Sequence, residues 1–261
     1  MPIYRGYFKI LFTRNSDYNV IYRGKNLKDG KEEAATVEGK VTIITFYLQI
    51  PVMEYNSESQ NSLIKELLEN RYIFQLKKWE CIPIMNVSGT SLYKDITMLY
   101  KETTNPVWAF VVFQTTRSKN QQMYNGQFDY IIVKNLWFDI GGKRYPEDPW
   151  ELDFDNGRCT LVYDAFLNFQ RCFFKTDPPY MATIPYVDKN NFKSMYPIYS
   201  VDLTNQPESI CAKIKITLHV DFNKSVSPPG GANEGIICYI VVVSNCMLHY
   251  EPAKNKITKI N

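Results

Sequence analysis

The 261 residues are 45% hydrophobic and 22% charged, and they include 19 Tyr, 15 Phe and 4 Trp. This composition excludes a disordered chain, and the length allows one large all-β domain or two smaller ones whose core needs no disulfide or metal. The net charge of +3, with both signs interspersed, provides no basic face for a nucleic-acid backbone, so no specific nucleic acid is expected as a partner.

Short β-branched and aromatic runs predict strands in the first hundred residues. We expect them over residues 7–13, 19–23, 36–53, 72–84 and 91–100. The first two should form a hairpin, and the polar residues 24–35 should form a solvated loop.

One helix is expected to interrupt these strands, over residues 57–70. Four apolar residues share one face at helical spacing: Leu63, Ile64, Leu67 and Leu68. Ser57 and Gln60 have the spacing of a capping box at its start.

The stretch from 107 to 154 organises the rest of the chain. Residues 107–116 are almost entirely apolar or β-branched, which predicts a core strand, and 128–140 predicts a second. Gly141-Gly142 supplies the positive φ angles of a tight hairpin turn. Residues 143–154 should return beside the strand, with Pro146 and Pro149 confining them to an edge or an irregular path.

A second helix is predicted over residues 159–174. Its apolar face consists of Val162, Phe166, Phe169 and Phe173. Asp155 and Asn156 are cap candidates ahead of it. Strands follow over 198–203, 212–222 and 236–250, with a glycine-rich loop at 227–235, so the chain is interpreted as an antiparallel all-β fold.

Six cysteines are scattered without a Cys-x-x-Cys pair, which predicts reduced, buried thiols. They are Cys81, Cys159, Cys172, Cys211, Cys238 and Cys246. The first residues have no basic and apolar signal pattern, so folding in the cytosol or nucleus is expected. The longest apolar run, near 236–243, is too short to span a membrane.

The search for chemistry assigns no catalytic, cofactor-binding or metal-binding residue, and we expect no enzyme. The two histidines, His219 and His249, lie in strand patterns typical of packed or surface residues. Asp153 and Asp155 could approach a calcium ion, but the ligand-rich acidic loop of such a site is missing. The Gly230-Gly231 loop lacks the lysine and hydroxyl of a phosphate loop.

Several segments resemble the double jelly-roll capsid-like proteins of Maverick/Polinton-type elements and related invertebrate viruses. The segments are 107–117, 128–133, Tyr145-Pro-Glu-Asp148 with Leu152-Asp-Phe154, 199–208 and 239–252, with weaker similarity at Lys78-Trp79 and 8–14. Members of that family are commonly longer, and the shortfall lies before Tyr7.

The resemblance implies a structural protein with two jelly-roll units, the first incomplete at 1–105 and the second at 106–261, each with one short helix. It implies a homotrimeric, pseudo-hexameric capsomer of an icosahedral virion shell, assembled in the host cytoplasm or nucleus, with itself and other capsid proteins as partners. The alternative is a domesticated jelly-roll module in which Trp137 or Trp150 stacks on a carbohydrate or peptide.

Overall fold

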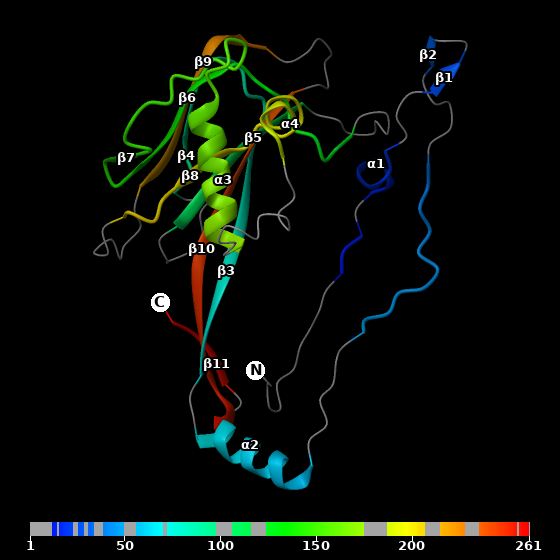
Figure 1. The fold of residues 1–261 in the computed structure, drawn as a ribbon, viewed down its shortest axis with the longest axis vertical. Coiled ribbons are helices and arrows are strands. Elements are labelled where there is room, and N and C mark those ends of the chain that lie inside the picture. The colour runs from blue at the N-terminus through cyan, green and yellow to red at the C-terminus, as the bar shows by residue number, and fades with distance from the viewer. Residues whose placement is uncertain are drawn as a thin grey trace. The chain divides into compact units, whose positions relative to one another are not determined.

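The computed structural model describes residues 12–14, 16–22, 26–28, 31–33, 39–49, 56–69, 72–97, 106–115, 124–174, 187–206, 215–227, 235–254 and 256–260. The chain divides into two compact units. The first comprises Met1–Lys77, Ser118–Tyr124 and Cys246–Asn261, and the second comprises Lys78–Arg117 and Asn125–Asn245. Figure 1 labels their helices and strands.

The second unit is a sandwich of two sheets whose strands are joined in a nested order. Its strands are β3 (Tyr72–Ile84) from Lys78 onward, β4 (Gly89–Asp95), β5 (Pro106–Thr115), β6 (Val133–Ile140), β7 (Lys143–Tyr145), β8 (Tyr199–Asp202), β9 (Ile216–Val226) and β10 (Ile236–Glu251) as far as Asn245. One sheet has the order β10-β5-β8 with β3 also on β10, and the other has the order β4-β9-β6-β7. The first strand therefore pairs with the last, the second with the next to last, and so on inward. This is the arrangement of an eight-stranded jelly roll.

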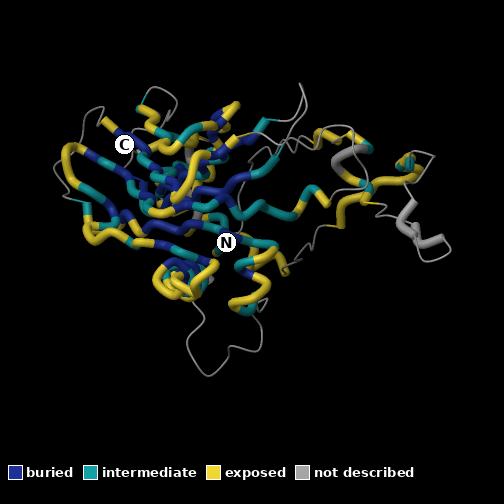
Figure 2. Tube along the Cα trace, turned by 90° about the horizontal axis from the view of Figure 1, so that it is seen from above, coloured by how far each residue is buried: buried dark blue, intermediate teal, exposed yellow. Residues whose placement is uncertain are grey.

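The core lies between the two sheets, and alternate residues of each strand point into it. On β9, for example, Ile216, Leu218, Val220 and Phe222 are buried, while His219 and Asp221 are partly exposed on the other face. Figure 2 shows the buried residues gathered in the strands of the sandwich. The predicted all-β, antiparallel jelly-roll fold is confirmed.

Strand β5 is buried on both faces because helix α3 (Thr160–Phe174) covers the outside of its sheet. Ala109, Val111 and Phe113 belong to the main core, whereas Trp108 and Phe110 form a second cluster with Phe169 of α3. This double burial explains the continuous apolar run from which the core strand was predicted. The helix and its apolar face are confirmed.

The hairpin at Gly141-Gly142 is confirmed, with φ angles of 60° and 84°. The returning strand β7 is only three residues long, and Pro146 follows it. Asp139 Oδ1 accepts a hydrogen bond of 3.0 Å from the Gly142 N–H, and Gly141 N–H donates to the Lys215 carbonyl at 3.1 Å.

Helix α4 (Lys189–Met195) lies in a stretch for which no helix was predicted. Asp188 caps it by accepting hydrogen bonds from the N–H groups of Asn190 and Asn191, and Phe192 is its one fully buried side chain. With a single buried residue, the segment has no helical period for the sequence to reveal.

The first unit differs more from expectation. It contains α1 (Asp17–Val20), a hairpin of β1 (Asn26–Lys28) and β2 (Lys31–Glu33), α2 (Ser57–Glu69), the 3-10 helix η2 (Pro252–Lys254) and β11 (Lys256–Ile260), which pairs with the end of β10. The strand expected at 19–23 is wrong where α1 occupies it, and the loop expected at 24–35 contains the hairpin. Residues 39–49 form no strand, and the rest of 36–53 lies outside the described residues, as do 7–11.

Both predicted helix caps are wrong. Asn56, not Ser57, caps α2, because its Oδ1 accepts from the Ser59 N–H at 2.8 Å. Ahead of α3, Asn156 donates instead to Asp153 within a turn closed by the Asp153–Arg158 bridge.

The division at residue 105 stays a prediction. In the structure β4, which lies before that boundary, pairs with β9.

Candidate functional site

Four side chains form a continuous stack across the outer face of the β4-β9-β6-β7 sheet. Tyr93, His219 and Trp137 lie directly opposite one another in neighbouring strands. The His219 ring is 4.8 Å from the Tyr93 ring, edge to face, and 4.8 Å from the Trp137 ring in a parallel stack. The Arg144 guanidinium lies 4.2 Å from the centre of the Trp137 ring. We call these residues the cross-strand stack.

The cross-strand stack occupies both faces of the Trp137 ring. His219 comes from β9 and Arg144 from β7, and these strands flank β6 on opposite sides. A tryptophan that binds a sugar needs an open ring face on which the sugar can lie. Trp137 therefore does not offer the stacking platform that the sequence suggested.

The environment of His219 lowers the pKa of its imidazole. Burial lowers its pKa, and the nearby Arg144 and Lys215 lower it further, while Asp139 and Asp221 act in the opposite direction. The other histidine, His249, lies on β10 with its Nδ1 3.8 Å from Glu251 Oε1. The expectation that each histidine is a packed strand residue fits both environments.

The second suggested platform, Trp150, lines an open cavity of about 360 Å³. The cavity is bounded by Trp150, Glu151, Leu152, Arg158, Thr160 and Leu161. Glu151 has a φ of 46°, and its N–H donates to Asn135 Oδ1 at 2.9 Å. A half-buried indole beside a guanidinium and a hydroxyl is able to bind a small polar ligand.

The two carboxylates considered for calcium are engaged by protein groups. Asp153 accepts hydrogen bonds from the side chain and backbone of Asn156, at 2.7 and 3.2 Å, and these bonds lower its pKa. Asp155 lies 3.6 Å from the Lys193 ammonium. Among the described residues, no three acidic, histidine or cysteine side chains gather as metal ligands would.

The cysteines differ partly from expectation. Cys159 and Cys238 are buried free thiols as predicted, but Cys81 and Cys172 are exposed. Burial raises the pKa of the Cys238 thiol. Cys211 lies outside the described residues.

Trp79 is an exposed aromatic residue beside α3 that the sequence placed only in a strand. Its ring stacks on Phe110 at 5.8 Å and meets Phe173 edge to face at 5.2 Å, yet 47% of the residue stays exposed. Exposed tryptophan at the border of an apolar cluster is typical of protein interfaces. Its position between charged residues, Lys78 and Glu80, is the only sequence signal.

The first unit exposes a continuous uncharged segment, residues 41–49, which we call the apolar arm. Its sequence is Val-Thr-Ile-Ile-Thr-Phe-Tyr-Leu-Gln. Five of its apolar side chains, Ile43, Ile44, Phe46, Tyr47 and Leu48, are between 52% and 93% exposed. Exposed apolar surface of this extent marks a contact site or an aggregation hazard.

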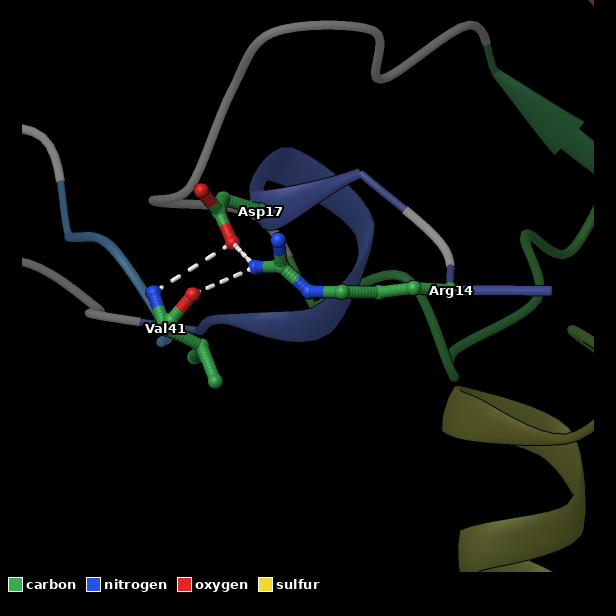
Figure 3. Close-up of polar contacts among 3 residues, drawn as sticks. All are labelled: Arg14, Asp17 and Val41. Carbon is green, nitrogen blue, oxygen red and sulfur yellow. Dashed lines mark hydrogen bonds and ion pairs between the residues drawn. The ribbon is translucent and has the colours of Figure 1, made fainter. Parts of the chain in front are cut away.

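The start of the apolar arm is held by a small polar clamp (Figure 3). Arg14 pairs with the Asp17 carboxylate and donates to the Val41 carbonyl at 2.6 Å. The Val41 N–H donates to Asp17 Oδ1 at 3.3 Å. The clamp fixes both backbone groups of Val41, so the arm begins from a defined point.

In the part of the chain that is described, no helix is long and apolar enough to cross a membrane.

One family of known proteins matches most of this chain. Residues 4–243 match the family described as the double jelly roll-like domain. A comparison with curated proteins finds no match. Among solved structures, a chain of the Sputnik virophage, determined by cryo-EM at 3.5 Å resolution, matches with 10% identity and a TM-score of 0.43. The match covers 73% of this chain and 39% of the virophage chain. Because the family match extends over most of its length, this chain belongs to the double jelly roll-like domain family.

Proposed function

We propose that this protein is a structural subunit of a viral-type shell, a major capsid protein that self-associates into homotrimeric capsomers. The nested eight-stranded sandwich of a double jelly roll-like chain carries this proposal. Jelly rolls of this topology form viral capsids, among other proteins. The exposed Trp79 and the apolar arm supply the apolar and aromatic surface on which association depends.

A pseudo-hexagonal capsomer contains six jelly rolls. A trimer that forms such a capsomer therefore needs two jelly rolls at each of its three subunit positions. The described residues contain one complete sandwich. The second roll would be supplied by another chain. We further propose an origin in a Maverick/Polinton-type element or a related virus, with the protein located in the virion after assembly in the host cytoplasm or nucleus.

Size exclusion coupled to light scattering, followed by electron microscopy of the peak, tests this function. The expected result is a mass of three or more subunits and ring-like particles. A monodisperse species near 30.5 kDa, unchanged as the protein concentration increases, would overturn the proposal.

The Trp150 cavity supports a second candidate, a binding module for a carbohydrate or peptide. Titration with a glycan panel should then quench tryptophan fluorescence. Trp150→Ala should abolish the quenching, whereas Trp137→Ala should not, since both faces of Trp137 are covered. No quenching by any glycan or peptide would leave the capsid proposal alone.

A further inference from the structure

The apolar arm has the chemistry of a strand but pairs with none of the described strands. Residues 41–49 include no charge, no proline and no glycine, and β-branched or aromatic residues make up seven of the nine. In the described structure the arm is a coil without an arrow (Figure 1), and only Val41 at its start is hydrogen-bonded, through the clamp. An extended segment of this kind readily adds to the edge of another sheet.

The two faces of the arm differ when it is extended. Ile44, Phe46 and Leu48 would share one face, and Ile43, Thr45 and Tyr47 the other. Phe12 packs edge to face on Phe46 at 4.6 Å, yet both rings remain mostly exposed. One face is therefore apolar from Ile44 to Leu48, and Phe12 widens it.

The exposed surface is large enough for a stable contact between proteins. With about 200 Å² for each large aromatic side chain, the arm and Phe12 expose roughly 700 Å² of side-chain surface at the fractions observed. Each partner of a standard interface contributes about 800 Å². The lack of charge means that a second copy of the same chain meets no repulsion here.

The jelly roll offers several strand edges, and most of them carry features that oppose pairing. Strands β7 and β8 are three and four residues long. Strand β11 contains Lys256 and Lys259, and β3 contains Lys77, Lys78 and Pro83. Lysine, proline and short length are the devices that keep edge strands from accepting a new strand. Strand β4 carries Lys94 and Asp95 at its end, but its residues 90–93 are uncharged, and β9 is its partner on one side only.

We propose that the apolar arm of one copy adds as a strand to the outer edge of β4 in a second copy. This inference rests on the proposed assembly and names its contact. Because the arm and β4 are different surfaces, the interface is heterologous, and its repetition closes a ring when the rotation between copies is a whole fraction of a turn. A trimer satisfies this requirement.

The test compares full-length chains that differ at matched isoleucines. The double variant Ile44→Asp with Leu48→Asp should convert the assembly to a monomer at concentrations where the wild type is assembled. Ile43→Asp should weaken the assembly at least tenfold. Ile257→Asp is the control, because Ile257 is also an isoleucine of the first unit and is 55% exposed, compared with 57% for Ile43. It should assemble as the wild type does.

Hydrogen exchange supplies the second measurement. Residues 42–48 and those amides of residues 90–93 that point away from β9 should become protected together as the protein assembles, and these amides should exchange rapidly in the dilute monomer.

Four outcomes would contradict the inference in distinguishable ways. If the wild type assembles and the aspartate variants do too, the arm contact is wrong and the proposed function stands. Protection of the arm at every dilution would show that it pairs within its own chain. Protection of the arm without residues 90–93 would show that β4 is the wrong edge. A wild type that stays monomeric would overturn the proposed function and the inference together.

Discussion

At the scale of single residues, the cross-strand stack shows how an exposed sheet face can be ordered without chemistry. Tyr93, His219, Trp137 and Arg144 come from four different strands, and each contacts the next. A neutral imidazole between two aromatic rings packs as an aromatic residue does. The stack explains why a histidine, a tryptophan and an arginine meet on this face of a protein for which no catalytic role is proposed.

The lowered pKa of His219 predicts a pH dependence of stability. The folded protein binds the proton less readily than the unfolded chain, whose histidine pKa is about 6.5. The contribution of His219 to the free energy of unfolding is therefore fully present above the pKa of the unfolded chain. It is lost as the pH falls from that pKa through the lower pKa of the folded protein. An NMR titration should place the His219 midpoint below 6.5.

Urea unfolding measured at several pH values completes this test. His219→Gln should remove the decline in the free energy of unfolding below pH 6.5, while His249→Gln should keep this decline. A His219 titration midpoint above 6.5 would show that Asp139 and Asp221 raise the pKa of His219 by more than burial lowers it.

Phe169 carries the contact between α3 and the sheet. Its ring lies 4.4 Å from that of Phe110 and 5.3 Å from that of Trp108. Phe169→Ala should lower the free energy of unfolding by about 3 kcal/mol, since it opens a cavity among large rings. Leu161→Ala on the same helix, where the side chain is exposed, should change it by less than about 0.5 kcal/mol. Chemical denaturation of both variants measures the difference, and equal effects would contradict the packing.

At the scale of elements, the Gly141-Gly142 turn sets the register of β6 and β7. Both residues have positive φ, which β-branched side chains resist. Replacing both by valine should prevent soluble folding or greatly lower the thermal midpoint. Gly141→Asn is the matched control, because Asn-Gly suits the same turn and should fold normally. A double-valine variant with the solubility and midpoint of the wild type would show that the turn does not need these angles.

The elements that the sequence predicted well are those that their own residues determine. Strand β5 has a continuous apolar run, and helix α3 has apolar residues at helical spacing. The pair Gly141-Gly142 between two strand patterns is typical of a tight hairpin turn. The apolar arm has an equally strong strand composition, yet it forms no strand, because a strand also needs a partner. Helix α4 was missed since Phe192 alone anchors it.

The candidate surfaces were less predictable for the same reason. The sequence singled out Trp137, but only the registers of β9 with β6 and of β6 with β7 show that His219 and Arg144 cover it. The sequence suggested no role for Trp79, because its surroundings depend on how helix α3 packs on the sheet and brings Phe173 against its ring. Surface function at this level depends on pairing between distant segments, which a single sequence does not specify.

At the scale of the whole molecule, the jelly roll is closed by its most distant pair of strands. Strand β3 pairs with β10, so the sandwich needs residues from both ends of the range 72–251. The helices and hairpin of residues 12–69 contribute no strand to either sheet. This separation predicts that the sandwich and the association surface can be divided by truncation.

A chain of residues 72–261 should therefore fold and lose assembly. It keeps every strand from β3 to β11, so we expect a soluble protein with a single cooperative thermal transition. We also expect the mass of a monomer, because the apolar arm is absent. A shorter chain that starts at Gly89 lacks β3. It would leave one side of β10 and the rings around Trp79 without their partner, and it should be insoluble. Circular dichroism melting and light scattering measure both chains. If the 72–261 chain were insoluble while the full chain is soluble, residues 1–71 would be part of the folding unit; if it assembled like the full chain, the contact between copies would lie on the sandwich itself.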